Sequence, residues 1–135
     1  MNVLKISRAV ANQLLHLAQI SPNSEICGLV GGSTGHARHA YPIANIAASP
    51  ADRFQLEPKS QIDAMRHMRE RGEELVAIYH SHPNGPALPS AVDIREASYP
   101  EAVYLIVSLD TKGVLDMRGF RLAQGAAVEV ELELE

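Results

Sequence analysis

Two continuous apolar segments of strand length constrain the fold of this chain more than any other feature. They are Leu75–His80 (Leu-Val-Ala-Ile-Tyr-His) and Ala102–Ser108 (Ala-Val-Tyr-Leu-Ile-Val-Ser). Apolar runs of roughly four to eight residues, bounded by turn-forming residues, are typical of strands buried in a sheet. Between them the sequence predicts a Pro- and Gly-rich loop at 83–89 and a helix at about 91–98. We therefore expect an α/β (α+β) protein built around a buried sheet.

Two further helices are predicted from apolar residues spaced three and four apart. The first begins at about residue 8 after Ser7, a typical N-cap, and the second begins at Pro58 and ends near Gly72. Their predicted buried faces are Val10, Leu14 and Leu17 in the first helix, and Ile62, Met65 and Met68 in the second. Strands are predicted at 2–6, 25–32, 37–47, 53–57, 114–122 and 127–134, with a turn marked by Asp110, Lys112 and Gly113.

The last eight residues alternate strictly between Val or Leu and Glu. Val128, Val130, Leu132 and Leu134 are expected to face the core and the glutamates to face water, as in a charged edge strand. The chain has 12 Lys+Arg and 16 Asp+Glu, a net charge of −4, so these four glutamates match the whole acidic excess. A negative net charge opposes binding to a phosphate backbone, so nucleic acid is not expected as the main partner.

The chain length of 135 residues predicts one domain, 1–135. A chain of this size buries roughly 65–70% of its unfolded surface, so a metal is not needed for stability and would serve chemistry. Cys27 is the single cysteine and cannot form an internal disulfide. No segment approaches the ~20 apolar residues of a membrane span. These features predict a cytoplasmic protein that does not enter a membrane.

The candidate chemistry is concentrated after the first apolar segment, in the pattern His80-x-His82 followed after ten residues by Asp93. Alternate side chains of a strand point to the same face, so both imidazoles are expected to project into one space. Asp93 falls in the first turn of the predicted helix, from where its carboxylate can reach back. Two histidines and one carboxylate suit Zn²⁺, and three protein ligands leave a fourth position for water, as in catalytic zinc sites. We expect one zinc ion per chain.

Hydrolysis at such a site also needs a proton carrier and a group that stabilises the oxyanion. Glu25 is the candidate general acid/base, because it stands at the start of an apolar strand where nothing in the local pattern calls for a charge. Ser90 is the candidate oxyanion stabiliser through its hydroxyl. Alternatively, Ser90 and Asp93 form a capping box that does no more than start a helix, and Glu25 is a surface carboxylate.

Other reactive side chains have structural interpretations. Cys27 could be a nucleophile paired with histidine, but its apolar neighbours raise a thiol pKa, so we expect it to be buried and inert. His36 and His39 lie in a glycine-rich segment without a helix, so we do not expect a second metal site there. The basic residues of the second helix, Arg66, His67, Arg69 and Arg71, are expected to form a solvated face.

The residues Glu25, His80-Ser81-His82-Pro83 and Ser90-x-x-Asp93 together resemble the JAMM motif of the MPN+ (Mov34/MPN/PAD-1) metallopeptidases. The segments Glu25-x-Cys27-Gly28-Leu29 and Phe54-Gln55 are similar to the compact prokaryotic branch of that family. The resemblance implies a mixed, curved β-sheet flanked by helices. It also implies zinc on His80, His82 and Asp93, with Glu25 and Ser90 in the catalytic roles given above.

Members of that family cleave peptide or isopeptide bonds after the C-terminal Gly-Gly of ubiquitin or ubiquitin-like proteins, including small sulfur-carrier proteins. The resemblance therefore implies a carrier of this kind as partner. The segments 33–53 and 98–102 are short compared with the insertions of eukaryotic deubiquitinating members, which favours a prokaryotic carrier. Two alternatives stay open: a non-catalytic MPN scaffold and a RadC-like protein linked to DNA repair. The oligomeric state is not predicted.

Overall fold

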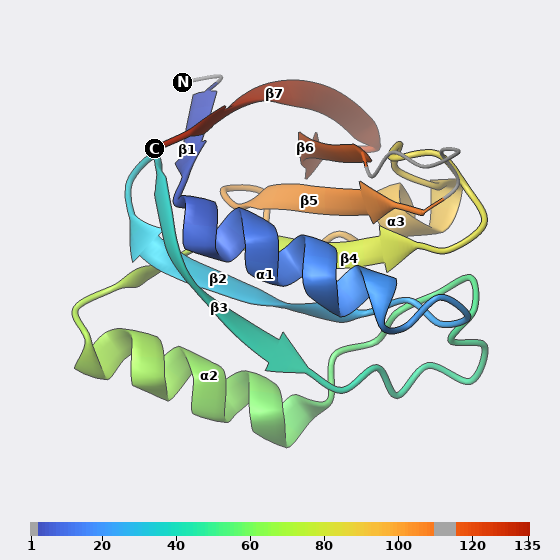
Figure 1. Cartoon of the computed structure of the whole chain (residues 1–135), viewed down its shortest axis with the longest axis horizontal. Helices are drawn as coiled ribbons and strands as arrows, with labels where there is room; N and C mark the ends of the chain where they lie inside the picture. Colours follow the sequence, from blue (N-terminus) through green and yellow to red (C-terminus); the bar gives the residue numbers. More distant parts are fainter. Residues whose placement is uncertain (1–2, 110–115) are drawn as a thin grey trace.

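The computed structural model describes residues 3–109 and 116–135, and its elements follow the predicted order (Figure 1). The predicted turn at 110–113 lies outside the described residues. In chain order the elements are β1 (Val3–Ile6), α1 (Arg8–Gln19), β2 (Cys27–Ser33), β3 (His36–Ile43), α2 (Pro58–Glu70), β4 (Glu74–His82), α3 (Ala91–Glu96), β5 (Val103–Ser108), β6 (Asp116–Ala123) and β7 (Ala126–Leu134).

The strands form one mixed sheet in the order β1-β3-β2-β4-β5-β6-β7, and this sheet closes into a barrel because β1 also pairs with β7. The two predicted apolar segments become the neighbouring strands β4 and β5, which run parallel, as expected for strands joined through the helix α3. β1 pairs in parallel with β3 and β7, and the remaining pairs are antiparallel. The predicted α+β fold with a mixed, curved sheet is confirmed.

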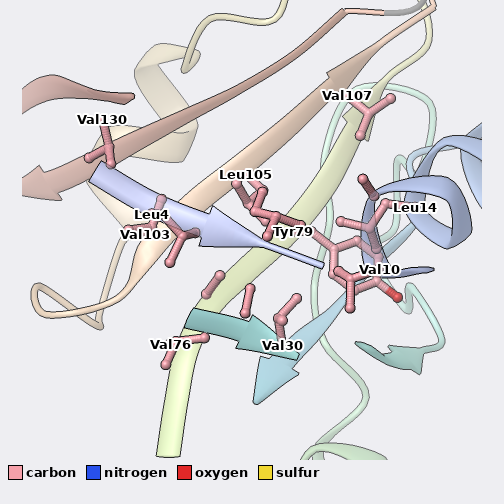
Figure 2. Packing of buried hydrophobic residues seen from close by; sticks show 14 of the residues in the cluster. Leu4, Val10, Leu14, Val30, Val76, Tyr79, Val103, Leu105, Val107 and Val130 are labelled. Atoms are coloured by element: carbon pink, nitrogen blue, oxygen red, sulfur yellow. The ribbon is translucent and has the colours of Figure 1, made fainter. Parts of the chain in front are cut away.

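The two long helices pack on opposite sides of the sheet and divide the core into two clusters. The first cluster combines Val10 and Leu14 of α1 with inward residues of the barrel strands, such as Tyr79 and Leu105 (Figure 2). The second cluster combines Met68 of α2 with residues on the other faces of the same strands, including Ile78 and Ile106. β4 and β5 are therefore covered on both faces, which explains their continuous apolar sequences.

The helix predictions hold in their bounds but not in every buried residue. Ser7 caps α1 by accepting a hydrogen bond from the Val10 N–H at 3.2 Å. Leu17 is only half-buried, whereas the smaller Ala18 is fully buried. In α2 the buried residues are Ala64 and Met68, and Ile62 is 67% exposed because it lies on the side of the helix that faces away from the sheet. No helix among the described residues is long and apolar enough to cross a membrane.

Two strand predictions were wrong. β7 is not an edge strand, since it is hydrogen-bonded to both β6 and β1. Of its four apolar residues Val130 is buried and Leu132 partly buried, whereas Val128 and Leu134, towards the two ends of the strand, are each 56% exposed. Residues 53–57 form no strand: their one β-bridge joins Leu56 to Asn45, which lies beyond the end of β3. The Asn45 side chain also binds backbone groups of this segment, at Arg53 and Gln55.

Candidate metal centre and active site

Strand β4 delivers both histidines to one place, as the alternation predicts. His80 and His82 share the face of the strand that carries Ile78, and both are buried, at 0% and 8% exposed. Both residues are still paired with β5, where His82 lies opposite Ser108. The strand ends at His82, directly before Pro83. The two imidazoles therefore project from a rigid ladder rather than from a loop.

The short helix α3 brings Asp93 to the histidines and is itself held by the predicted capping box. Ser90 Oγ accepts the Asp93 N–H at 3.0 Å, and Asp93 Oδ2 accepts the Ser90 N–H at 2.9 Å. The same Oδ2 atom lies 3.1 Å from the Nε2 atoms of both His80 and His82. The capping and metal-binding interpretations are therefore compatible, because the cap orients the carboxylate towards the imidazoles.

Three potential ligand atoms thus form a nearly equilateral triangle. The two Nε2 atoms of His80 and His82 are also 3.1 Å apart. Tetrahedral zinc with bonds of about 2.0–2.1 Å places its ligand atoms about 3.3–3.4 Å from one another, so the triangle is close to the required size. His82 Nδ1 lies 2.9 Å from the carbonyl oxygen of Pro86. A carbonyl can only accept, so Nδ1 carries a proton, and Nε2 is the ring nitrogen that hydrogen-bonds to Asp93 and that can bind a metal once it is deprotonated.

The electrostatics of the triangle favour a positive charge within it. Burial raises a carboxyl pKa, but hydrogen bonds with His80 and His82 outweigh it and hold the pKa of Asp93 well below its usual value. Burial likewise lowers the pKa of His80, whereas hydrogen bonds with Asp93 and Pro86 overcome burial and raise that of His82. An ionised Asp93 beside two imidazoles is a set of groups that a metal cation can bind in place of the imidazole protons.

Glu25 lies two residues before β2, with its side chain beside the histidines. It is 4% exposed, and its backbone N–H donates to the Pro50 carbonyl at 2.7 Å. One carboxylate oxygen of Glu25 and one ring nitrogen each of His80 and His82 lie within 4.8 Å of one another. Asp93 approaches the histidines more closely, at 3.1 Å. By distance, Asp93 is the better candidate for the third ligand, and Glu25 is a neighbour of the candidate centre.

The Glu25 carboxyl group has fewer hydrogen-bond partners than a buried polar group usually has. No described residue offers a hydrogen bond to its Oε1 atom. Burial raises the pKa of Glu25 to about 8, against an attraction by His82 and with a further contribution from repulsion by Asp93. A carboxyl group with such a pKa can accept and release a proton near neutral pH, which is what a general acid/base requires.

Phe54 adds an apolar wall that the sequence did not assign to the site. Its ring stacks on His80 with centroids 4.4 Å apart and an angle of 19° between the planes. Beside it, a groove of about 810 Å³ runs between the 47–56 segment and α3, with Ile78 and Tyr104 also lining it, and it reaches Asp93. Neither feature has a local sequence signal, because both depend on the 47–56 segment folding over β4.

The remaining candidates stand apart from this centre. Cys27 is buried, its thiol lies 3.4 Å from the Ile43 carbonyl oxygen, and burial raises its pKa to about 12, which leaves it protonated and unreactive. His36 contacts Glu135 and His39 contacts Glu73, so each has a single carboxylate partner. Among the described residues, no second group of three potential metal ligands occurs away from the centre.

The donor set fits a metal ion, and the additional buried carboxylate fits metal-assisted hydrolysis. Comparison with known proteins supports this chemistry. Residues 7–122 match the family model of prokaryotic homologues of the JAB domain. A desampylase of Haloferax volcanii is 36% identical over 91 residues, which cover 66% of each chain. The CysO-cysteine peptidase of Mycobacterium tuberculosis is 32% identical over 129 residues, covering 94% of this chain and 88% of the relative.

Two further relatives agree with these. A probable TtuB-protein conjugate cleaving protease of Thermus thermophilus is 33% identical over 127 residues, covering 93% of this chain and 80% of that one. The solution structure of a protein from Desulfitobacterium hafniense superposes with a TM-score of 0.87 at 31% identity, covering 98% of this chain and 92% of the other. The family match spans most of the chain and includes every residue of the candidate centre, from Glu25 to Asp93. The chain therefore belongs to the prokaryotic JAB-domain proteins of the JAMM/MPN family.

Proposed function

We propose that this protein is a zinc metallopeptidase that hydrolyses the peptide or isopeptide bond after the C-terminal Gly-Gly of a small ubiquitin-like or sulfur-carrier protein. The observation that carries the proposal is the buried triangle of His80, His82 and Asp93, with atoms 3.1 Å apart, beside the unpartnered carboxylate of Glu25. Membership of the JAB/JAMM family implies the use of a metal ion. The names of the CysO-cysteine and TtuB-conjugate peptidases support the substrate class.

His80, His82 and Asp93 hold the zinc ion in this proposal. When bound, zinc supplies a Lewis acid that polarises the scissile carbonyl and makes a water molecule more acidic. The carbonyl of Pro86 keeps the proton of His82 on Nδ1, so that Nε2 is free to coordinate. The cap made by Ser90 keeps Asp93 turned towards the two histidines.

Glu25 transfers the proton. Its carboxylate accepts a proton from the attacking water and returns it to the departing amine, and its raised pKa suits both steps. Ser90 is the oxyanion stabiliser. Its Oγ atom accepts the Asp93 N–H, which leaves the hydroxyl proton free to be donated to a developing oxyanion. Ser90 thereby combines a helix-capping role with a catalytic one.

The substrate tail lies in the groove beside Phe54 and Asp93. Glycine allows a backbone to lie close against a protein surface, so a Gly-Gly end can bring its carbonyl to the buried centre, where a larger side chain would collide. The single cysteine, buried and without a disulfide partner, is consistent with a reducing compartment, and we place the protein in the cytoplasm. The non-catalytic scaffold alternative is disfavoured because all four polar residues of the centre are present.

A cleavage assay with defined zinc content tests the proposal. Zinc-loaded protein is incubated with a small ubiquitin-like carrier extended beyond Gly-Gly by one peptide-linked residue, and mass spectrometry identifies the products. We expect a carrier that ends in Gly-Gly, with no product after chelation and none from a matched carrier ending in Ala-Ala. A stoichiometrically zinc-loaded protein that cleaves neither carrier, or that cleaves both equally after chelation, contradicts the proposal.

A further inference from the structure

Asn45 joins the site to the segment that covers it. It lies just after β3, and its side-chain amide makes four hydrogen bonds. Nδ2 donates to the carbonyl oxygens of Glu25 at 3.0 Å and Arg53 at 2.9 Å. Oδ1 accepts the N–H groups of Ala47 and Gln55, both at 3.0 Å. A single side chain therefore ties the backbone of Glu25 to both sides of the 45–56 turn.

These hydrogen bonds surround the two groups that flank the metal centre. Arg53 and Gln55 are the chain neighbours of Phe54, so Asn45 holds the backbone on both sides of the ring that stacks on His80. The Glu25 carbonyl is held by Asn45, and the Glu25 N–H is held by Pro50 of the same segment. Asn45 therefore hydrogen-bonds to the backbone of Glu25 itself and to the backbone of the residues on either side of Phe54.

Other hydrogen bonds hold parts of this region: the Glu25 N–H donates to Pro50, and Ile26 is hydrogen-bonded to Ser81 of β4. The 45–56 segment is paired with itself by the hydrogen bonds Ile46 N–H to Gln55 O and Glu57 N–H to Ala44 O, which close the turn but do not reach Glu25. Asn45 is the described side chain that spans from this turn to the Glu25 carbonyl. Without the Nδ2 donors, the turn can stay closed and Glu25 stays attached through its N–H to Pro50, but the Glu25 carbonyl and the backbone beside Phe54 lose their common anchor.

We propose that Asn45 is a positioning residue for the hydrolytic centre. It sets the place of the Glu25 carboxylate and of the Phe54 ring relative to His80, and it touches no reacting atom. This inference rests on the proposed function, because it assigns Asn45 a role in that same reaction. A shift of about 1 Å in a catalytic group is enough to cost roughly 100-fold in rate, so the effect on turnover is expected to exceed the effect on folding.

The substitution Asn45→Asp is the sharpest probe, because it preserves size and both acceptor contacts but removes the two N–H donors. It also places a carboxylate oxygen against the carbonyl oxygens of Glu25 and Arg53, and these oxygen atoms repel one another. When the zinc-loaded variant is assayed on the Gly-Gly carrier, we expect kcat to fall at least tenfold. We expect KM to change less than about threefold and the zinc content of the protein to be unchanged. Val10→Ala, which opens a cavity in the distant first core cluster, is the control for lost stability.

A double-mutant cycle distinguishes positioning from a general loss of structure. If Asn45 acts through Glu25, Asn45→Asp reduces the residual rate of Glu25→Gln less than about threefold. Equal losses in the wild-type and Glu25→Gln backgrounds, or a wild-type kcat in Asn45→Asp, overturn the proposal. Val10→Ala is expected to lower the melting temperature without changing kcat.

A second readout needs no turnover and separates this inference from the proposed function. In zinc-free protein, NMR measures the ring-current shift that Phe54 imposes on the His80 ring protons. We expect Asn45→Asp to reduce that shift towards the value of Phe54→Leu, while Val10→Ala keeps it. An unchanged shift in Asn45→Asp overturns the positioning role even if the protein is an active peptidase. A reduced shift supports it even if the Gly-Gly carrier is not cleaved.

Discussion

Two clusters of histidine and carboxylate occur at opposite ends of strand β4, and only one has the properties of a reactive site. At the start of the strand, Glu73 accepts a hydrogen bond from the Tyr41 hydroxyl at 2.7 Å through Oε1, and its Oε2 contacts His39 Nδ1. At the end of the strand, Glu25 lies beside His80 with its Oε1 unpartnered among the described residues. The two sites contain the same residue types, but the carboxylate of Glu73 has hydrogen-bond partners whereas Oε1 of Glu25 has none among the described residues.

The difference appears directly in the acidity of the two carboxyl groups. Glu25 is buried, at 4% exposed, whereas Glu73 is only partly buried as a residue, although its side chain is 8% exposed. Burial raises both pKa values, but hydrogen bonds from Tyr41 and His39 outweigh it at Glu73 and lower its pKa overall. No described residue donates to Oε1 of Glu25, and burial raises the pKa of Glu25 to about 8. A buried carboxylate with donors stabilises a fold, whereas one without them is available for proton transfer.

Matched glutamine substitutions test this contrast with the largest expected effect. Glu25→Gln removes the proton carrier, so we expect kcat on a Gly-Gly carrier to fall by about 10²–10⁴-fold, with zinc retained and the free energy of unfolding unchanged or increased. Glu73→Gln is expected to leave kcat within about twofold and to lower the free energy of unfolding by about 1 kcal/mol. Steady-state kinetics and chemical denaturation measure both. Equal losses of kcat in the two variants would show that the clusters do not differ in function.

The second test concerns metal binding, and the free-energy change that we expect from it is smaller than the change in activation free energy expected for Glu25→Gln. A ligand at 100 times its dissociation constant stabilises a folded protein by about 2.7 kcal/mol, so zinc is expected to raise the melting temperature of zinc-free wild-type protein. His82→Ala should lose most of that rise, because it removes one corner of the 3.1 Å triangle. His39→Ala should keep it, because His39 is half-exposed and has one carboxylate partner. Calorimetric scans with and without zinc compare the three proteins, and an equal rise in His82→Ala and wild type places the zinc elsewhere.

The elements that the sequence predicted well are those determined by local periodicity. Alternation along β4 is sufficient to place His80 and His82 on one face, and the spacing Ser90-x-x-Asp93 is sufficient to predict the capping box. Glu25 stood out as a charge at the start of an apolar strand, and it is buried as that position suggests. The roles of these residues in catalysis stay predictions until the variants are measured.

Other features could not be predicted because they depend on pairing between distant segments. The alternation in β7 is the same for an edge strand and for a barrel strand, and its second neighbour, β1, is at the other end of the chain. Asn45 carries no local signal, since its partners Glu25 and Arg53 become neighbours only when the 45–56 turn folds over the sheet. The same is true of the Phe54 ring on His80.

The smallest expected effect is a pH dependence of stability at the Glu73 cluster. The pKa of Glu73 in the folded protein lies below its ordinary value of 4.5, so the hydrogen bond from Tyr41 stabilises the fold above about pH 4.5 and is lost as the pH falls through the folded-state pKa. Tyr41→Phe should therefore cost about 1 kcal/mol at pH 7 and less at pH 3.5, as measured by urea denaturation at each pH. In a Glu73→Gln background the cost should be the same at both values, because no carboxylate remains to be protonated. A cost that is independent of pH in the wild-type background would mean that Tyr41 contributes by packing or by accepting the hydrogen bond from Arg71, and not through Glu73. The Glu73 cluster would then differ from the Glu25 site in position rather than in hydrogen bonding.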